Sequence, residues 1–131
     1  MLAYIENRFP ENGLLKIRTE YGIMTGKWCE NDTPSFKQYD IEIDTDQPVA
    51  IKEVSFTSEV HPNIMQNGFT TYITGYVIDV DRFSITLQLN GDIILLETTD
   101  NPNFLQYLHR WVCVSVTDLL FYNTNIEFQR T

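Results

Sequence analysis

Residues 84–97 read SITLQLNGDIILLE, and this stretch decides the fold class. The dipeptide Asn90-Gly91 separates two runs rich in apolar residues, a pattern that predicts a β-hairpin with a two-residue type I′ turn. Both central residues of such a turn need positive φ, which asparagine and glycine tolerate. The short loop fixes the pairing register, which is Leu89 with Asp92, Leu87 with Ile94 and Ile85 with Leu96. Because apolar residues meet in the last two pairs, the pattern and the turn predict the same hairpin.

The segment before this hairpin, 69–81, reads FTTYITGYVIDVD and predicts a long strand. Period-two alternation places a set of larger side chains on one of its faces, namely Tyr72, Tyr76, Ile78 and Val80. A single glycine inside a strand usually marks a bulge or a sharp bend, so we expect one at Gly75.

One short helix is expected after the hairpin, near residues 102–109. Asn101 suits the N-cap and Pro102 the first helical position, and the apolar stripe consists of Phe104, Leu105 and Leu108. A strand follows in 111–116, with Val112, Val114 and Val116 on one face. Two turns of helix are the full extent of the helical signal.

The first half of the chain also shows short apolar runs broken by turn signals rather than a helical period. Strands are expected at 14–19, 22–28 and 39–45, with a further alternating run around 54–57. The sequence therefore predicts an all-β, antiparallel fold with one short helix, built as a single domain over 1–131.

The element order over 69–122 resembles an OB-fold. The glycine in the long first strand and the helix between the third and fourth strands carry the resemblance. It implies a barrel, to which residues 1–60 would add strands at the N-terminal side; a closed antiparallel sandwich is the alternative architecture.

The composition is acidic, with 9 Lys and Arg against 18 Asp and Glu and a formal net charge of −9. Such a chain repels nucleic acid and anionic membranes and attracts basic proteins, so we expect neither nucleic acid nor membrane as a partner. The N-terminal residues do not resemble a signal peptide, and no apolar run is long enough to span a bilayer. The sequence therefore predicts a cytoplasmic protein. Whether Cys29 and Cys113 pair is left open.

The acidic excess is concentrated in residues 30–59, and within them the stretch 39–46 reads YDIEIDTD. As a strand, this stretch points Ile41, Ile43 and Thr45 to one side and four carboxylates to the other, namely Asp40, Glu42, Asp44 and Asp46. The column is either a solvated face that deters edge-to-edge pairing or a binding face for a basic protein. In the second case Phe36 and Tyr39, just upstream, are the expected aromatic anchors.

No catalytic or metal centre is predicted. Asp40, Glu42 and Asp44 resemble the start of an EF-hand loop, but Thr45 and Ile51 stand where that loop needs Gly and Glu. His61 and His109 have no second ligand at metal-binding spacing, and no cofactor motif occurs. The second and third strands of the OB-like order lack the basic residues that nucleic acid requires.

A small, acidic, cytosolic β-domain without catalytic motifs is similar to bacterial immunity proteins, which neutralise a cognate toxin. The resemblance implies a tight complex with a basic toxin or nuclease domain, whose active site the immunity protein covers. A general protein-interaction module is the alternative, and a small-ligand binder or enzyme using Glu59, His61 and Tyr72 is the third possibility. The oligomeric state is left open.

Overall fold

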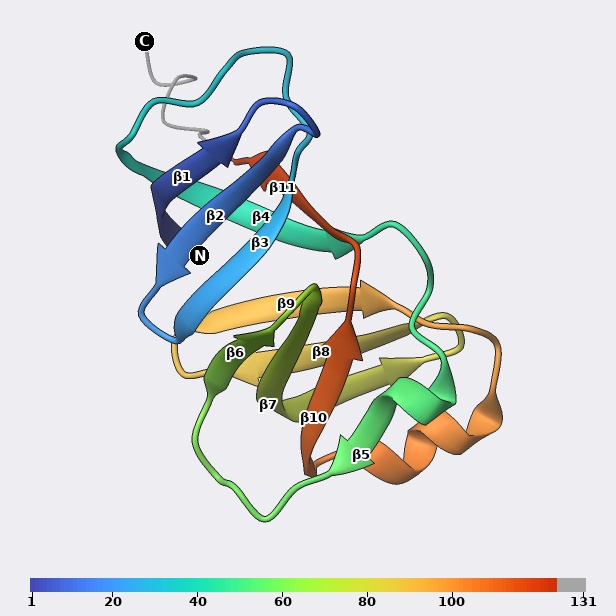
Figure 1. Ribbon diagram of the computed structural model, residues 1–131. Coiled ribbons are helices and arrows are strands. Elements are labelled where there is room, and N and C mark those ends of the chain that lie inside the picture. Colours follow the sequence, from blue (N-terminus) through green and yellow to red (C-terminus); the bar gives the residue numbers. More distant parts are fainter. Residues whose placement is uncertain (125–131) are drawn as a thin grey trace, which may run out of the picture.

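Five strands close into a barrel, and six more form a sheet beside it, as the computed structural model shows for residues 1–124, the part of the chain it describes (Figure 1). The barrel strands are β1 (Leu2–Phe9), β2 (Leu14–Thr19), β3 (Gly22–Trp28), β4 (Gln38–Thr45) and β11 (Leu119–Asn123). The outer strands are β5 (Val54–Phe56), β6 (Asn63–Asn67), β7 (Thr70–Asp81), β8 (Ser84–Leu89), β9 (Asp92–Glu97) and β10 (Trp111–Val116). Two 3₁₀ helices, η1 (Ile51–Glu53) and η2 (Pro102–Tyr107), complete the fold of these residues. The all-β prediction is confirmed.

The barrel closes in the order β1-β2-β3-β11-β4 and back to β1. Its closing contact is parallel, with Leu120 opposite Lys27 and Phe121 opposite Trp28, while the other neighbours are antiparallel. Gly26 permits this approach, because a Cβ there would lie 2.7 Å from the ring of Phe121. That ring is fully buried in the core.

The barrel does not lie where the sequence suggested. Within 69–122, β9 pairs only with β8, and β11 leaves the region to join β3 and β4. The expected OB-like placement at 69–122 is therefore wrong, and the additional strands are inserted between β4 and β11 instead of preceding the barrel. Local strand order does not determine which distant edge completes a ring, because the closing pairs are far apart in sequence.

The outer sheet is built around the long strand β7. Strands β6 and β8 pair with successive parts of β7 on one side, and β10 pairs on the other side. Ile73 and Val77 of β7 are buried, whereas Tyr72 and Tyr76 lie on the opposite, partly exposed face. Tyr72 and Tyr76 thus share one face, as predicted, and this face makes its contacts outside the core: Tyr76 packs on Trp111 and stacks with His109.

The predicted hairpin register is confirmed at all three pairs. The predicted type I′ turn is wrong, because Asn90 has φ 46° while Gly91 lies outside the left-handed region. The bulge of β7 falls between Val77 and Asp79 and not at Gly75. Gly75 instead allows β8 to approach closely, since a Cβ there would lie 3.2 Å from the Gln88 carbonyl oxygen.

Helix η2 occupies part of the predicted helical segment. The Asn101 side chain accepts a hydrogen bond from the backbone N–H of Asn103 (2.9 Å), as expected of an N-cap. The helix is 3₁₀ and ends at Tyr107, so residues three apart share a face. Phe104 and Tyr107 are therefore buried, while Leu105, a member of the predicted stripe, is exposed.

Barrel and sheet are joined at Tyr21 and Gly22. The backbone N–H of Ile64 donates to the Tyr21 carbonyl (2.9 Å), and a Cβ on Gly22 would lie 1.8 Å from the Ile64 oxygen. The hydroxyl of Tyr21 donates towards Leu89 O (2.7 Å) and Asp92 Oδ2 (2.6 Å), both at the β8–β9 turn. Burial and the neighbouring Asp92 carboxylate raise the pKa of Tyr21 far above its ordinary value. This joint fixes the orientation of the barrel relative to the outer sheet; we call these two parts the lobes.

Candidate functional site

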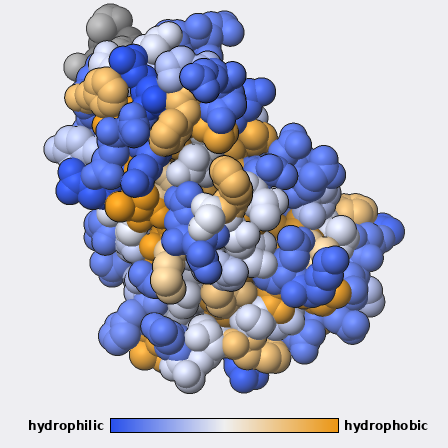
Figure 2. All heavy atoms as spheres, viewed as in Figure 1, coloured by the Kyte–Doolittle hydropathy of each residue, from blue (hydrophilic) through white to orange (hydrophobic). Residues whose placement is uncertain are grey.

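A groove of about 870 Å³ runs between the outer face of β4 and strand β9. We call it the acidic groove and define it by Asp40, Glu42, Asp44, Ile93, Leu95 and Glu97. One wall belongs to the barrel and the other to the outer sheet, so the groove exists only in the assembled fold. Figure 2 shows that hydrophilic side chains cover much of the surface in that view, with hydrophobic patches where the two lobes meet.

The barrel wall carries three carboxylates in a column. The strand repeat spaces them at steps of about 6.8 Å. Asp40 is paired with the amino group of Met1 (2.7 Å), and Asp44 accepts a hydrogen bond from the N–H of Thr45 (2.8 Å). Within residues 1–124, Glu42 and Asp44 form no ion pair, and neither does Glu97 on the opposite wall. Among the described residues, Glu42, Asp44 and Glu97 therefore line the groove without a cation partner.

The opposite wall is mainly apolar, with Glu97 at its end. Ile93 and Leu95 are 62% and 58% exposed, because β9 buries its alternate residues Ile94 and Leu96 in the core. Tyr122 of β11 pairs in register with Glu42 and also lines the groove. Cys29 raises the pKa of Tyr122, with smaller contributions from burial and from Asp44 and Glu30. An apolar strip thus faces a negative one.

Three of the predicted site residues, Asp40, Glu42 and Asp44, lie together in the groove. Asp46 does not: β4 ends at Thr45, and the N–H of Asp46 bonds to the carbonyl of Asp118 (2.9 Å). Its side chain lines a separate pocket that also includes Lys27. The fourth position of the predicted column is therefore wrong, because the strand ends before it.

The predicted aromatic anchors lie elsewhere. Tyr39 is buried in the barrel with its ring edge against Trp28, and its hydroxyl accepts the N–H of Ser35 (2.9 Å). It is not accessible to a partner, so that prediction is wrong. Phe36 is exposed but lies under the guanidinium of Arg8 (4.5 Å) and lines another pocket. The apolar contact surface of the groove comes instead from Ile93 and Leu95, which in sequence look like ordinary strand residues.

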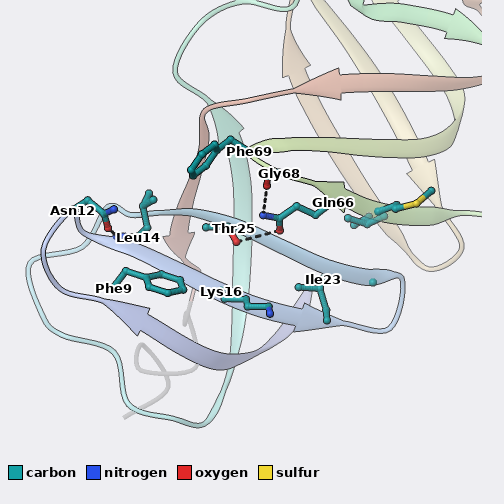
Figure 3. Close-up of a pocket in the computed structure, with 12 residues that line it drawn as sticks. Phe9, Asn12, Leu14, Lys16, Ile23, Thr25, Gln66, Gly68 and Phe69 are labelled. Atoms are coloured by element: carbon teal, nitrogen blue, oxygen red, sulfur yellow. Dashed lines mark hydrogen bonds between the residues drawn. The ribbon is translucent and has the colours of Figure 1, made fainter.

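A second groove, of about 690 Å³, lies on the other side of the junction between the lobes (Figure 3). We call it the β2–β6 groove and define it by Phe9, Leu14, Lys16, Ile23, Gln66 and Phe69. Its floor is the outer face of β2 and β3, and the β6–β7 hairpin forms its upper wall in Figure 3. The sequence contains no signal that these distant segments meet.

The remaining candidate residues, for a ligand or enzyme site, a metal site or a disulfide, lie outside the two grooves. Glu59 and His61 are exposed in the segment before β6, and Tyr72 lies on the outer face of β7. Residues 1–124 contain no group of three or more His, Cys, Asp or Glu side chains placed to hold a metal ion. Cys29 and Cys113 are both free thiols.

In the same residues, no helix is long and apolar enough to cross a membrane. The chain matches no protein-family model, and neither a curated protein sequence nor a solved structure matches it. A function for the chain is therefore inferred from the chemistry of the two grooves.

Proposed function

We propose that this chain is an acidic protein-binding module that holds a basic partner in the acidic groove. The observation that carries the proposal is a set of three carboxylates, Glu42, Asp44 and Glu97, that have no cation partner among residues 1–124. They line one groove together with the exposed apolar residues Ile93 and Leu95. Like charges along one strand repel one another, and lysine or arginine side chains of a partner would remove that repulsion.

The two walls serve different steps of binding. The negative wall attracts a cationic surface over several ångströms and accelerates its approach. Ile93 and Leu95 then lose water on contact with apolar side chains of the partner, which slows dissociation. A groove of this kind binds a protruding basic segment better than a flat surface.

Within this class, we propose an immunity or inhibitor protein that acts in the cytoplasm and neutralises a basic toxin domain by covering its active or substrate-binding surface. The size and acidity of the chain support this choice. The alternative is a general interaction module with the same groove. Co-expression separates the two, because only an antidote restores growth to cells that express the partner domain.

The groove is tested with the double variant Glu42→Lys/Asp44→Lys. With the partner isolated on the immobilised wild-type protein, association is measured by surface plasmon resonance at low and high salt. We expect the variant to associate about tenfold or more slowly at 0.01 M salt. The difference should shrink at 1 M salt, where the Debye length falls to about 3 Å.

The matched control is Glu11→Lys/Glu59→Lys, which changes the net charge equally at exposed positions outside the groove. It should lose much less of the association rate. The neutral pair Glu42→Gln/Asp44→Asn should give a smaller loss in the same direction as the lysine pair. Unchanged association of the groove variant at low salt, or an equal loss in the control, would reject the acidic groove as the binding site.

A further inference from the structure

The β2–β6 groove differs from the rest of the molecule in its charge. The chain carries a net charge of −9, yet among the described residues no carboxylate lines this groove, and its one charged lining residue is Lys16. The remaining lining is mainly apolar, with amides from Asn12 and Gln66. A concave, mainly apolar site with a few polar groups is the usual form of a small-molecule pocket.

Lys16 has no counter-charge within residues 1–124. It lies partly buried on β2, opposite Thr25 of β3, and forms no ion pair or cation–π contact in this part of the chain. Arg18, the next outward residue on the same strand, contrasts with it. Its guanidinium pairs with Glu6 (2.9 Å) and lies over the ring of Tyr4 (5.5 Å). An anionic ligand group would give Lys16 the partner that the fold gives to Arg18.

The opposite wall is held in place before any ligand arrives. The side-chain oxygen of Gln66 accepts from the hydroxyl of Thr25 (3.1 Å), and its amide nitrogen donates to the carbonyl of Gly68 (2.9 Å) (Figure 3). Gly68 has φ 63°, which lets the chain turn tightly there. These bonds connect the hairpin to the barrel and fix the turn that carries Phe69.

Phe69 lies in this turn and is 83% exposed. In Figure 3 its ring stands above the strands that carry Leu14, Lys16 and Phe9. A phenyl ring so exposed is costly in water, and a flat apolar ligand lying against it would cover it.

We propose that the β2–β6 groove binds a small organic anion with an aromatic body, whose anionic group pairs with Lys16 and whose ring packs against Phe69. The volume of 690 Å³ falls within the range of about 300–1,000 Å³ typical of small-ligand sites. This site is separate from the acidic groove, and the inference does not rest on the proposed function.

The test uses the probe 8-anilinonaphthalene-1-sulfonate, an aromatic anion, and its uncharged analogue N-phenyl-1-naphthylamine. Fluorescence titration gives the affinity of each, and ¹⁵N–¹H correlation spectra locate the anion on the folded protein. We expect shifts centred on the backbone of residues 14–16, 23–25 and 66–69. The anion should bind at least about tenfold more tightly than the uncharged analogue.

Two variants test the two contacts. Lys16→Met keeps the apolar stem and should weaken binding of the anion about tenfold while leaving the uncharged analogue unchanged. Phe69→Ser should weaken both probes. The controls are Lys52→Met and Phe83→Ser, which remove an exposed lysine and an exposed phenylalanine outside the groove and should change neither affinity.

Three outcomes would overturn the proposal. In the first, the anion binds Lys16→Met as tightly as the wild type; in the second, its shifts map to another face. In the third, a short oligothymidylate displaces the probe and binds more tightly, which would identify the groove as a single-strand nucleic-acid site instead.

Discussion

The two grooves lie at the same junction of barrel and sheet, yet they carry opposite charge. The acidic groove takes its barrel wall from β4, whose outward residues are Asp40, Glu42 and Asp44. The β2–β6 groove takes its barrel wall from β2 and β3, whose outward charges are basic. The same barrel therefore supplies the negative wall of the acidic groove and the lysine of the β2–β6 groove.

The contrast between the grooves shows that net charge is a poor guide to the ligand of an individual site. A chain at −9 should repel anions on average, but an anion in the β2–β6 groove meets Lys16 with no carboxylate among the described lining residues. Because both grooves depend on the same joint, a substitution at the joint should disrupt both. A substitution of a lining residue should alter only one.

The largest effect is expected from Gly22→Ala, which should disrupt both grooves. Its Cβ would meet the Ile64 carbonyl oxygen at 1.8 Å, and the φ of 145° is unfavourable for alanine. We expect a loss of unfolding free energy of about 4 kcal/mol or more, in the range of the most damaging single substitutions. Urea denaturation followed by tryptophan fluorescence measures it.

Gly68→Ala is the control for this experiment. Gly68 also has positive φ, but no atom lies within 4 Å of the position that a Cβ would occupy there. The substitution should cost only the backbone strain of about 1–2 kcal/mol. Equal losses for the two variants would show that the close approach of Gly22 to Ile64 is not required to hold the barrel against the outer sheet.

Tyr21→Phe should have an intermediate effect. It removes the hydroxyl that bonds to Leu89 O and Asp92 Oδ2, so both groups lose a buried donor. The expected loss is about 1–3 kcal/mol. It should affect the acidic groove more than the β2–β6 groove, because the lost bonds hold the turn that begins β9.

The same residue gives a dependence on pH. Burial raises the pKa of Tyr21 in the folded state, so folding favours its neutral form. The stabilisation is complete below the unfolded pKa of about 10 and is lost as the pH rises above it. The wild type should therefore lose stability above pH ~10 more steeply than Tyr21→Phe. Parallel slopes in alkaline denaturation curves would contradict the buried hydroxyl.

The smallest effect is expected at the turn between β8 and β9. Asn90 has φ 46°, so Asn90→Gly removes a strained conformation but adds freedom to the unfolded chain. The net gain in stability should be less than about 1 kcal/mol. Gly91→Ala should be nearly neutral, because its surroundings are open. A marked loss for Gly91→Ala would restore the type I′ turn predicted from sequence.

Much of the local structure could be predicted from the sequence. Alternation and turn residues located the strands and the hairpin register, and Asn101 identified the start of η2. Alternation also placed Asp40, Glu42 and Asp44 on one face. The same alternation assigns Tyr39 to the side of Ile41 and Ile43, so its burial was predictable even though an anchor was expected there.

The long-range arrangement could not be predicted in this way. Nothing local to Phe121 indicates that it pairs beside Trp28, and Ile93 resembles a core residue until β9 is known to lie at an edge. Lys16 is an ordinary strand lysine in sequence. Its role depends on the β6–β7 hairpin, which the chain reaches only after more than forty further residues.

The closing strand of the barrel also determines how the protein can fold. The backbone bond between Asp46 and Asp118 brings together the two ends of the inserted sheet. During synthesis, β1 to β4 emerge with a gap between β3 and β4 that only β11 can fill, and contacts so distant in sequence form slowly. Within the outer sheet, strands β6 to β9 join near neighbours in the chain and are expected to pair early. The half of the barrel that is made first must then wait for the last strand, and its open edges are where a nascent chain would meet a chaperone or another copy of itself.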